Sequence, residues 1–484
     1  ELRRHVSATW LEGRCVSYGA STPYLPMRDV IHDALGWSRG ELADGRALGG
    51  RRRGVSGGRD DAAPYRRAVV GMEPDRPTRP SSPETRRLRT LDAIRRLVVA
   101  AAERAPTVVA VEDLHWADAS TIQALERLVP ACDGLPLLFV FTTRGAMAAW
   151  LPDRAETIEL SPLPDDRIDD LVGALLEGRS IPSDLLGRVV ETSGGNPFFL
   201  SELIRSLVAS GALGSHAGRG PAAPAMELPN TIEKVILARL DLLEPAAREV
   251  VTAASVLGRT VALPVLERLV GSDPRADADE LVRARLFERN GQPDEMWFAH
   301  ALIQEVAYGS LLKRRRRELH STAAIAIEQL WPDRLEENLG VLAIHHRGAG
   351  DLAAAVRCHD LAADRAERLH ASEEALEHHT SSIEIAGQLG HTVADPEQAE
   401  RFLVRARLRA RTGDTPGARE DLEVVRAAEV ASDVAMRAHD ELGFALAGAA
   451  DYRAAVPHLE AALEAAEVLH DVSEQVTALS RLSI

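Results

Sequence analysis

Short, continuous apolar runs alternate with helical patterns in the first third of the chain. The runs at 107–112 (TVVAVE) and 136–143 (PLLFVFTT) lack polar alternation, which is typical of strands buried on both faces. Amphipathic stretches separate the runs, and strands that alternate with helices favour a parallel sheet. The pattern therefore predicts an α/β core. The expected helices cover 84–104, 119–130 and a stretch from Leu25, and further strands cover 10–16 and 156–160.

The strand at 107–112 ends in two adjacent carboxylates, Glu112 and Asp113. Carboxylates at the end of a buried strand are suited to hold Mg²⁺ or to orient an attacking water in phosphoryl transfer. Adjacent residues on a strand point to opposite sides, so the two acids differ in role. We assign Glu112 to the metal shell and Asp113 to water activation or metal support. The reverse assignment stays open, as does a pair that only caps the next helix.

The following strand ends in a polar stretch that closes with Arg144. Ligands bind at the carboxyl ends of parallel strands, so Arg144 is placed to reach a terminal phosphate and to sense its loss. The alternative is an ordinary surface arginine.

A second candidate stretch reads SGGNPFFLSEL (193–203). Gly195 permits a close backbone approach, Asn196 is suited to an N-cap, and Pro197 fits a first helical turn. Pro197 and Phe198 together offer an apolar wall for an adenine ring. By itself the stretch is only a well-capped helix start.

The rest of the chain is predicted to be helical apart from one hairpin pattern. Three helices followed by a hairpin around 287–298, turned at Asn290-Gly291, indicate a winged helix. The expected organisation is a core at 1–162 with a flexible insertion at 38–83, a helical lid at 163–213, a linker at 214–227, a winged-helix domain at 228–300 and helical repeats at 301–484.

The C-terminal region carries an internal similarity. Segments starting at Gly350, Gly413 and Ala450 each place Asp second and Ala four residues later. The last two are offset by 37 residues, from 413 to 450, and a period of about 34–40 residues is typical of tetratricopeptide-like α-solenoids. An irregular Ala-rich helical bundle is the alternative.

Charge and cysteine content limit the possible partners and compartments. The net charge of −16 argues against a broad nucleic-acid surface, and the basic run Lys313–Arg317 fits a solvated helix face. The three cysteines are far apart and form no metal or disulfide spacing, which fits a reducing cytoplasm. No apolar run approaches the roughly 18 residues of a membrane span. The adjacent histidines at 345–346 and 378–379 are expected on solvated helix surface.

Three motifs in this order, VEDLHWAD, FTTR and GGNPFFLSEL, resemble those of the signal-transduction ATPases with numerous domains (STAND), a branch of the AAA-like P-loop NTPases. Segments 13–31 and 298–320 extend the resemblance over most of the chain. It is closest to the ATPase modules of bacterial adenylate/guanylate cyclases and of large LuxR-type regulators. The resemblance implies ATP or ADP and Mg²⁺ as cofactors.

The phosphate loop of that family is missing. Its pattern, G-x-x-x-x-G-K-[ST], needs a lysine after glycine, and the only lysines, Lys234 and Lys313, do not fit. We therefore expect a fragment that lacks its N-terminal part and binds ATP weakly or not at all, unlike the full-length protein. The family's strand order places the missing strand beside the strand at 136–143.

The sequence thus predicts an ATP-binding regulatory module. A protein or small-molecule signal would act at the helical repeats, on an output domain upstream or downstream of this chain, such as a cyclase or a transcription regulator. Whether the module hydrolyses ATP stays open. The alternative is a non-enzymatic interaction scaffold on a degenerate NTPase fold. DNA binding through the winged helix is a third class, disfavoured by the acidic charge.

Overall fold

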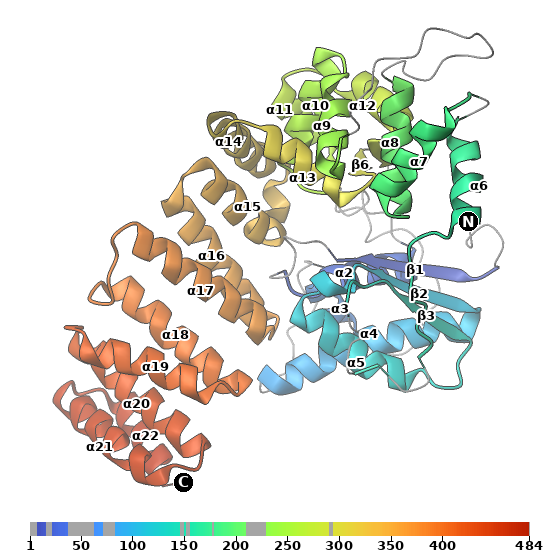
Figure 1. Ribbon diagram of the computed structural model, residues 1–484. Helices are drawn as coiled ribbons and strands as arrows, with labels where there is room; N and C mark the ends of the chain where they lie inside the picture. Colours follow the sequence, from blue (N-terminus) through green and yellow to red (C-terminus); the bar gives the residue numbers. More distant parts are fainter. Residues whose placement is uncertain are drawn as a thin grey trace. The chain divides into compact units, whose positions relative to one another are not determined.

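The computed structural model divides the chain into two compact units. One unit combines residues 1–154 and 331–484, and the other holds residues 155–330. Figure 1 follows the chain through both. The structure describes residues 7–15, 22–36, 62–70, 83–145, 150–151, 155–176, 179–209, 229–289 and 294–483.

A parallel sheet forms the centre of the N-terminal region (Figure 1). Its strands are β1 (Thr9–Arg14), β2 (Thr107–Glu112) and β3 (Leu137–Phe141), in that order. Thr9 is level with Thr107, and Thr107 with Leu137. The three carboxyl ends therefore lie at one edge of the sheet. The predicted parallel α/β core is confirmed.

Helices pack against this sheet around a continuous apolar core, to which Leu11 of β1, Val109 of β2 and Leu125 all contribute. The apolar stripes of these helices match their sequence periodicity. The helices are α2 (Leu25–Leu35), α3 (Ala63–Val69), α4 (Pro83–Arg104) and α5 (Ala119–Ala131).

Helix α3 corrects one prediction, because it lies inside the expected flexible insertion at 38–83. Val69 is fully buried, and the Tyr65 hydroxyl accepts a hydrogen bond from Arg89 Nη1 of α4 at 3.0 Å. Burial of such side chains stabilises a short helix that propensity alone would not. Residues 37–61 and 71–82, like the predicted linker at 214–227 and the Asn290-Gly291 turn, lie outside the described residues.

The outer edge of β3 has no neighbouring strand among the described residues. Leu138 and Val140 of β3 are 58% and 40% exposed, although their sequence is that of a buried strand. The strand predicted at 156–160 does not form, and Ile158 and Leu160 are 78% and 91% exposed. A strand requires a partner for its backbone groups, and this segment pairs with no described strand.

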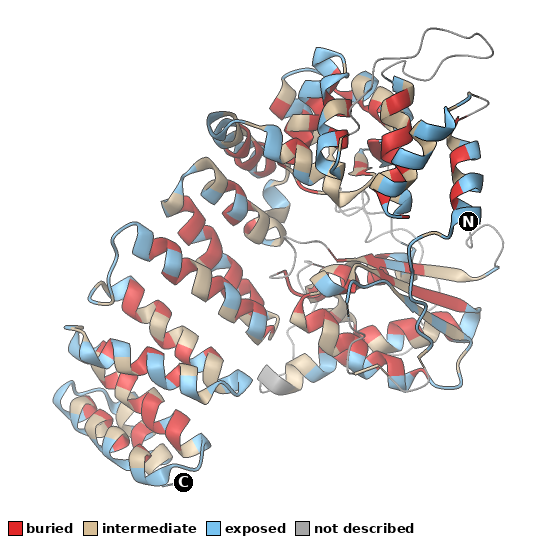
Figure 2. Ribbon diagram, in the orientation of Figure 1, coloured by how far each residue is buried: buried red, intermediate tan, exposed pale blue. Residues whose placement is uncertain are grey.

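The C-terminal helices stack as consecutive antiparallel neighbours (Figure 1), with their buried positions turned toward one another (Figure 2). The stack confirms tetratricopeptide-like repeats. Its helices are α15 (Leu335–Ala349), α16 (Leu352–Arg368), α17 (Ser372–Gln388), α18 (Pro396–Thr412), α19 (Thr415–Ala427), α20 (Ser432–Gly448), α21 (Tyr452–Val468) and α22 (Val472–Leu482).

The repeated Asp and Ala positions have clear structural roles. Asp351, Asp414 and Asp451 are N-caps, each accepting a hydrogen bond from a backbone N–H of the first turn of α16, α19 or α21. The alanine four residues later, at 355, 418 and 455, is at most 2% exposed. An aspartate cap fixes where each helix starts, and the small residue lets the next helix approach closely.

The unit at 155–330 begins with three helices, α6 (Asp165–Leu176), α7 (Ser183–Ser193) and α8 (Pro197–Ala209), which share one apolar core. A small antiparallel sheet of order β4-β6-β5 follows among further helices, as expected of a winged helix. These elements are α9 (Ile232–Asp241), α10 (Pro245–Ser255), β4 (Thr260–Ala262), α11 (Leu263–Val270), α12 (Arg275–Arg283), β5 (Phe287–Arg289), β6 (Glu295–Phe298), α13 (Ala301–Ser310) and α14 (Lys313–Leu330).

The histidine pairs correct a second prediction. His345, His378 and His379 are 2%, 2% and 6% exposed, so the expectation of solvated helix surface was wrong for these three. They occupy inward positions of closely packed, alanine-rich helices. In the parts of the chain that the structure describes, no helix has the length and apolar character needed to cross a bilayer.

Candidate nucleotide site

The candidate site starts from the shared carboxyl edge of β1, β2 and β3. Arg14 and Glu112 are direct partners in the parallel register, and Thr142 follows β3. Because the strands begin level and run parallel, side chains that are 98 residues apart in sequence meet at this edge. The edge is where doubly wound sheets bind ligands.

Glu112 is paired with Arg14. Arg14 Nε donates to Glu112 Oε2 at 2.5 Å, and Nη2 donates to the same oxygen. The side chains are 20% and 46% exposed, so the pair faces solvent on one side and contributes about 0–1 kcal/mol to stability. Both hydrogen bonds end on Oε2, so Arg14 occupies one of the two carboxylate oxygens of Glu112.

Asp113 lies in a left-handed conformation, with φ at 56°. Its backbone N–H donates to Thr142 Oγ1 at 2.9 Å, and Leu114 N–H donates to Thr142 O at 2.8 Å. A non-glycine residue at positive φ is uncommon outside turns and functional sites. The loop after β2 is thus hydrogen-bonded to the end of β3. Glu112 has the extended backbone of strand β2, whereas the backbone of Asp113 is left-handed.

Arg144 is exposed at the same edge. Its guanidinium lies over the Trp116 ring, 5.8 Å from the centroid, and Trp116 contacts His115 with ring centroids 4.5 Å apart. The cation–π contact therefore associates Arg144 with the turn after the acid pair.

The second candidate stretch belongs to the other unit, residues 155–330. Asn196 Oδ1 accepts hydrogen bonds from the N–H groups of Phe198 and Phe199 at 3.0 and 3.1 Å, as an N-cap does. Pro197 occupies the first position of α8.

Gly195 is required at its position. Its φ is +74°, and an added Cβ would lie 3.0 Å from Pro162 Cβ and 3.1 Å from Leu163 O. Leu163 N–H donates to Gly195 O at 2.8 Å. The close backbone approach predicted for this glycine thus occurs, and it occurs against the chain's own segment at 162–163.

Phe198 stacks on His300, with centroids 3.9 Å apart and an interplanar angle of 13°. His300 is also the N-cap of α13. One face of the Phe198 ring is therefore covered, and an adenine ring could use only the partly exposed remainder. The role of the 195–198 stretch in nucleotide binding stays a prediction.

The residues at the sheet edge suit Mg²⁺ in its usual mode. Mg²⁺ prefers hard oxygen donors and is commonly held by one or two carboxylates together with substrate phosphates. Glu112 and Asp113 supply two carboxylates, and no group of three or more potential metal-binding side chains occurs in the described part of the chain. Nearby Cys15 adds no charge, since burial raises the pKa of its thiol to about 12, with smaller contributions from carboxylates led by Asp118.

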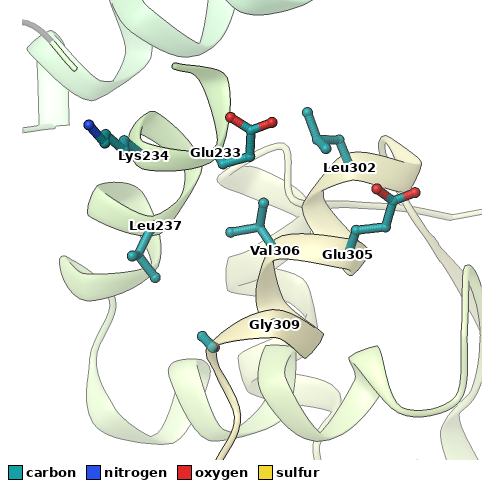
Figure 3. Close-up of a pocket in the computed structure, with 8 residues that line it drawn as sticks. Glu233, Lys234, Leu237, Leu302, Glu305, Val306 and Gly309 are labelled. Atoms are coloured by element: carbon teal, nitrogen blue, oxygen red, sulfur yellow. The ribbon is translucent and has the colours of Figure 1, made fainter. Parts of the chain in front are cut away.

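A separate groove lies between α9 and α13 (Figure 3). It has a volume of about 420 Å³, and Leu237 and Val306 line it together with Glu233, Lys234 and Glu305. Two carboxylates against one ammonium group oppose the binding of a polyphosphate. The groove is therefore no candidate for the nucleotide site.

Two features of the site were not predicted. Arg14 was not singled out, although its position at the end of β1 matches that of Glu112 at the end of β2; aligning the ends of the predicted strands would have found it. The second feature is the contact of Thr142, in the polar stretch before Arg144, whose hydroxyl accepts the Asp113 N–H.

Comparison with known proteins agrees with this reading of the core. Residues 1–140 match the family described as AAA ATPase domain. An uncharacterized protein of Rhizobium meliloti (strain 1021) is 27% identical over 425 residues, which are 83% of this chain and 40% of that protein. This chain thus spans less than half the length of that relative.

Among solved structures, a Signal Transduction ATPase with Numerous Domains (STAND) protein with a tetratricopeptide repeat sensor, from Pyrococcus horikoshii, is similar over 99% of this chain and 78% of its own. The identity is 10% and the TM-score is 0.37. The match to the AAA ATPase domain family covers β1, β2 and the acid pair, so the similarity lies in the part of the chain that holds the candidate site.

Proposed function

We propose that this chain is the regulatory ATPase module of a STAND-type signalling protein. The observation that carries the proposal is the convergence of Arg14, Glu112 and the Asp113–Thr142 contact at the carboxyl edge of an AAA-type sheet. In this proposal ATP would bind at that edge, and Glu112 and Asp113 would hold Mg²⁺. Bound Mg²⁺ would neutralise charge on the terminal phosphates.

The open edge of β3 supports a further part of the proposal. The sequence carries no G-x-x-x-x-G-K-[ST] pattern. In addition, β3 exposes apolar side chains, and no described strand pairs with its outer edge. We infer that a phosphate-loop strand from outside residues 1–484 pairs there. Its backbone would cover the β3 edge and its loop would bind the phosphates.

Arg14 then acts as a restraint on Glu112. The guanidinium binds Oε2 of Glu112 and there competes with metal and water for the carboxylate, so separation of the pair would favour hydrolysis. The helical repeats receive a protein or small-molecule signal. The output domain, a nucleotide cyclase or a transcription regulator, lies outside these residues. The three cysteines at 15, 132 and 358 are buried and form no disulfide among the described residues, which fits the proposed cytoplasmic location.

The test uses the protein extended through a phosphate loop, followed by hydrogen exchange. We expect Mg²⁺-ATP and Mg²⁺-ADP to protect the backbone amides after β2 and β3 to different degrees, because only ATP presents a terminal phosphate to this edge. Exchange that is identical with ATP, ADP and no nucleotide would instead support the rival function, a non-enzymatic interaction scaffold.

A further inference from the structure

Helix α5 of the ATPase core packs against α17 of the repeats, inside one compact unit. Ser120 N–H, in the first turn of α5, donates to Glu374 Oε1 of α17 at 2.7 Å. Glu374 is 2% exposed. A buried carboxylate that bonds a helix N-terminus is favourable for that helix, so this hydrogen bond joins the two elements.

A second buried carboxylate lies at the same place. Asp118 is 2% exposed, and its Oδ1 accepts the N–H groups of Tyr24 and Thr121, both at 2.8 Å. Its Oδ2 accepts the Thr121 hydroxyl at 2.7 Å. Asp118 thus caps α5 and also fixes the entry to α2.

The two carboxyl groups interact with each other. Glu374 Oε2 is buried and has no hydrogen-bond donor among the described residues. Two ionised carboxylates in contact repel strongly in a buried site, whereas one shared proton turns the contact into a hydrogen bond. The proton would also satisfy the Oε2 atom.

We propose that the Asp118–Glu374 contact is a latch, held by one shared proton, that fastens the repeats to the ATPase core and opens when the proton is lost. The inference goes beyond the proposed nucleotide function, because it concerns the α5–α17 contact and requires no nucleotide.

One neighbouring group, Glu377 of α17, shifts in the same direction as the pair: burial, and then the charge of Glu374, raises the pKa of Glu377. Glu374→Gln leaves Glu377 in place, so the loss of the pH-dependence in that variant assigns the proton to the Asp118–Glu374 pair. Arg87 of α4 acts on Tyr24; Glu373 accepts a hydrogen bond from Gln123 at 3.4 Å on the exposed side. His370, elsewhere on the repeats, has a pKa lowered to about 4, mainly by burial and then by Arg86. It therefore stays neutral at physiological pH.

The direction of the pH effect follows from the carboxyl groups. Burial, and then the charge of Glu374, raises the pKa of Asp118 to about 8, and burial also raises the pKa of Glu374. In the open state both would titrate near the usual value of about 4. The closed state therefore binds one additional proton between these limits. The latch is strongest below about pH 4, weakens about tenfold per pH unit, and is lost above about pH 8.

The test is hydrogen exchange of residues 1–484, corrected for intrinsic rates, at pH 6, 7, 8 and 9. We expect the protection of peptides spanning 117–125 and 372–380 to fall about tenfold per pH unit up to 8 and then to level off. Glu374→Gln should abolish the slope, since its amide donates to Asp118 at every pH. Glu373→Gln, the exposed neighbour, should keep it.

A further variant distinguishes the pH-dependent latch from a pH-independent weakening of the contact between the core and the repeats. Arg28 Nη2 of α2 pairs with Glu337 of α15 at 2.9 Å, so Arg28→Gln should lower protection at every pH without changing the slope. If Glu374→Gln lacks the wild-type helical circular dichroism, Asp118→Asn replaces it with the same expectation. A flat wild-type profile, or a wild-type slope in a folded neutral variant, would overturn the proposal.

Discussion

Replacing Arg239 by alanine is expected to destabilise the unit at 155–330 by about 3–5 kcal/mol. Arg239 of α9 is 7% exposed and pairs with Glu202 of α8, which is fully buried. Arg239 Nη2 also donates to Ala284 O at 2.6 Å. Truncation leaves a buried carboxylate whose remaining cation is Arg205, 3.0 Å away and 33% exposed, so most of the desolvation cost is no longer offset.

The measurement is the free energy of opening of α8 and α9 from hydrogen exchange, because a chain of two units does not unfold in one step. The matched control is Arg248→Ala. Arg248 pairs with Asp241 at 2.6 Å, with side chains 44% and 52% exposed, and its loss should cost at most about 1 kcal/mol. The double variant Glu202→Leu/Arg239→Met should cost less than Arg239→Ala. Equal costs for Arg239→Ala and Arg248→Ala would contradict a structural role for the buried pair.

Glu112→Gln should lower the kcat for ATP hydrolysis by about 100-fold or more in the protein that includes a phosphate loop, the range expected when a catalytic carboxylate is neutralised. ATP affinity should change little if Glu112 orients water. If it holds Mg²⁺, the Mg²⁺ concentration for half-maximal rate should rise instead. The comparison with Asp113→Asn then decides between the two assignments of this acid pair.

The control for this experiment is Glu103→Gln, an exposed residue at the end of α4, which should leave kcat unchanged. Steady-state phosphate release at saturating ATP measures the effect. Full activity in both Glu112→Gln and Asp113→Asn would remove the acid pair from the chemistry.

Much of the core could be predicted because its signals are local. The run at 107–112 is apolar without interruption, and it forms β2 with the predicted bounds. The repeated Asp and Ala positions could be recognised because each Asp caps its own helix and each Ala serves a helix–helix contact that recurs. Local patterns of this kind need no knowledge of distant residues.

The remaining features depend on partners far away in sequence. Arg14 meets Glu112 only through the register of two strands, and Asp118 meets Glu374 across 256 residues, from 118 to 374, only through α17. Residues 156–160 have a strand's composition but pair with no strand among the described residues. The burial of the histidines at 345, 378 and 379 depends on which helix face the neighbouring helices cover. The sequence of an alanine-rich helix gives little indication of that face.

The central claim is tested most directly by equilibrium binding of a fluorescent ATP analogue with Mg²⁺ to two proteins. One is the chain of residues 1–484, and the other is the same chain extended through a phosphate loop. Saturable ATP binding by the extended protein is expected, with binding to residues 1–484 at least about 100-fold weaker, since a lost loop removes several charge-assisted hydrogen bonds to phosphate. Equal, tight binding by both proteins, or no binding by the extended protein, would contradict the account.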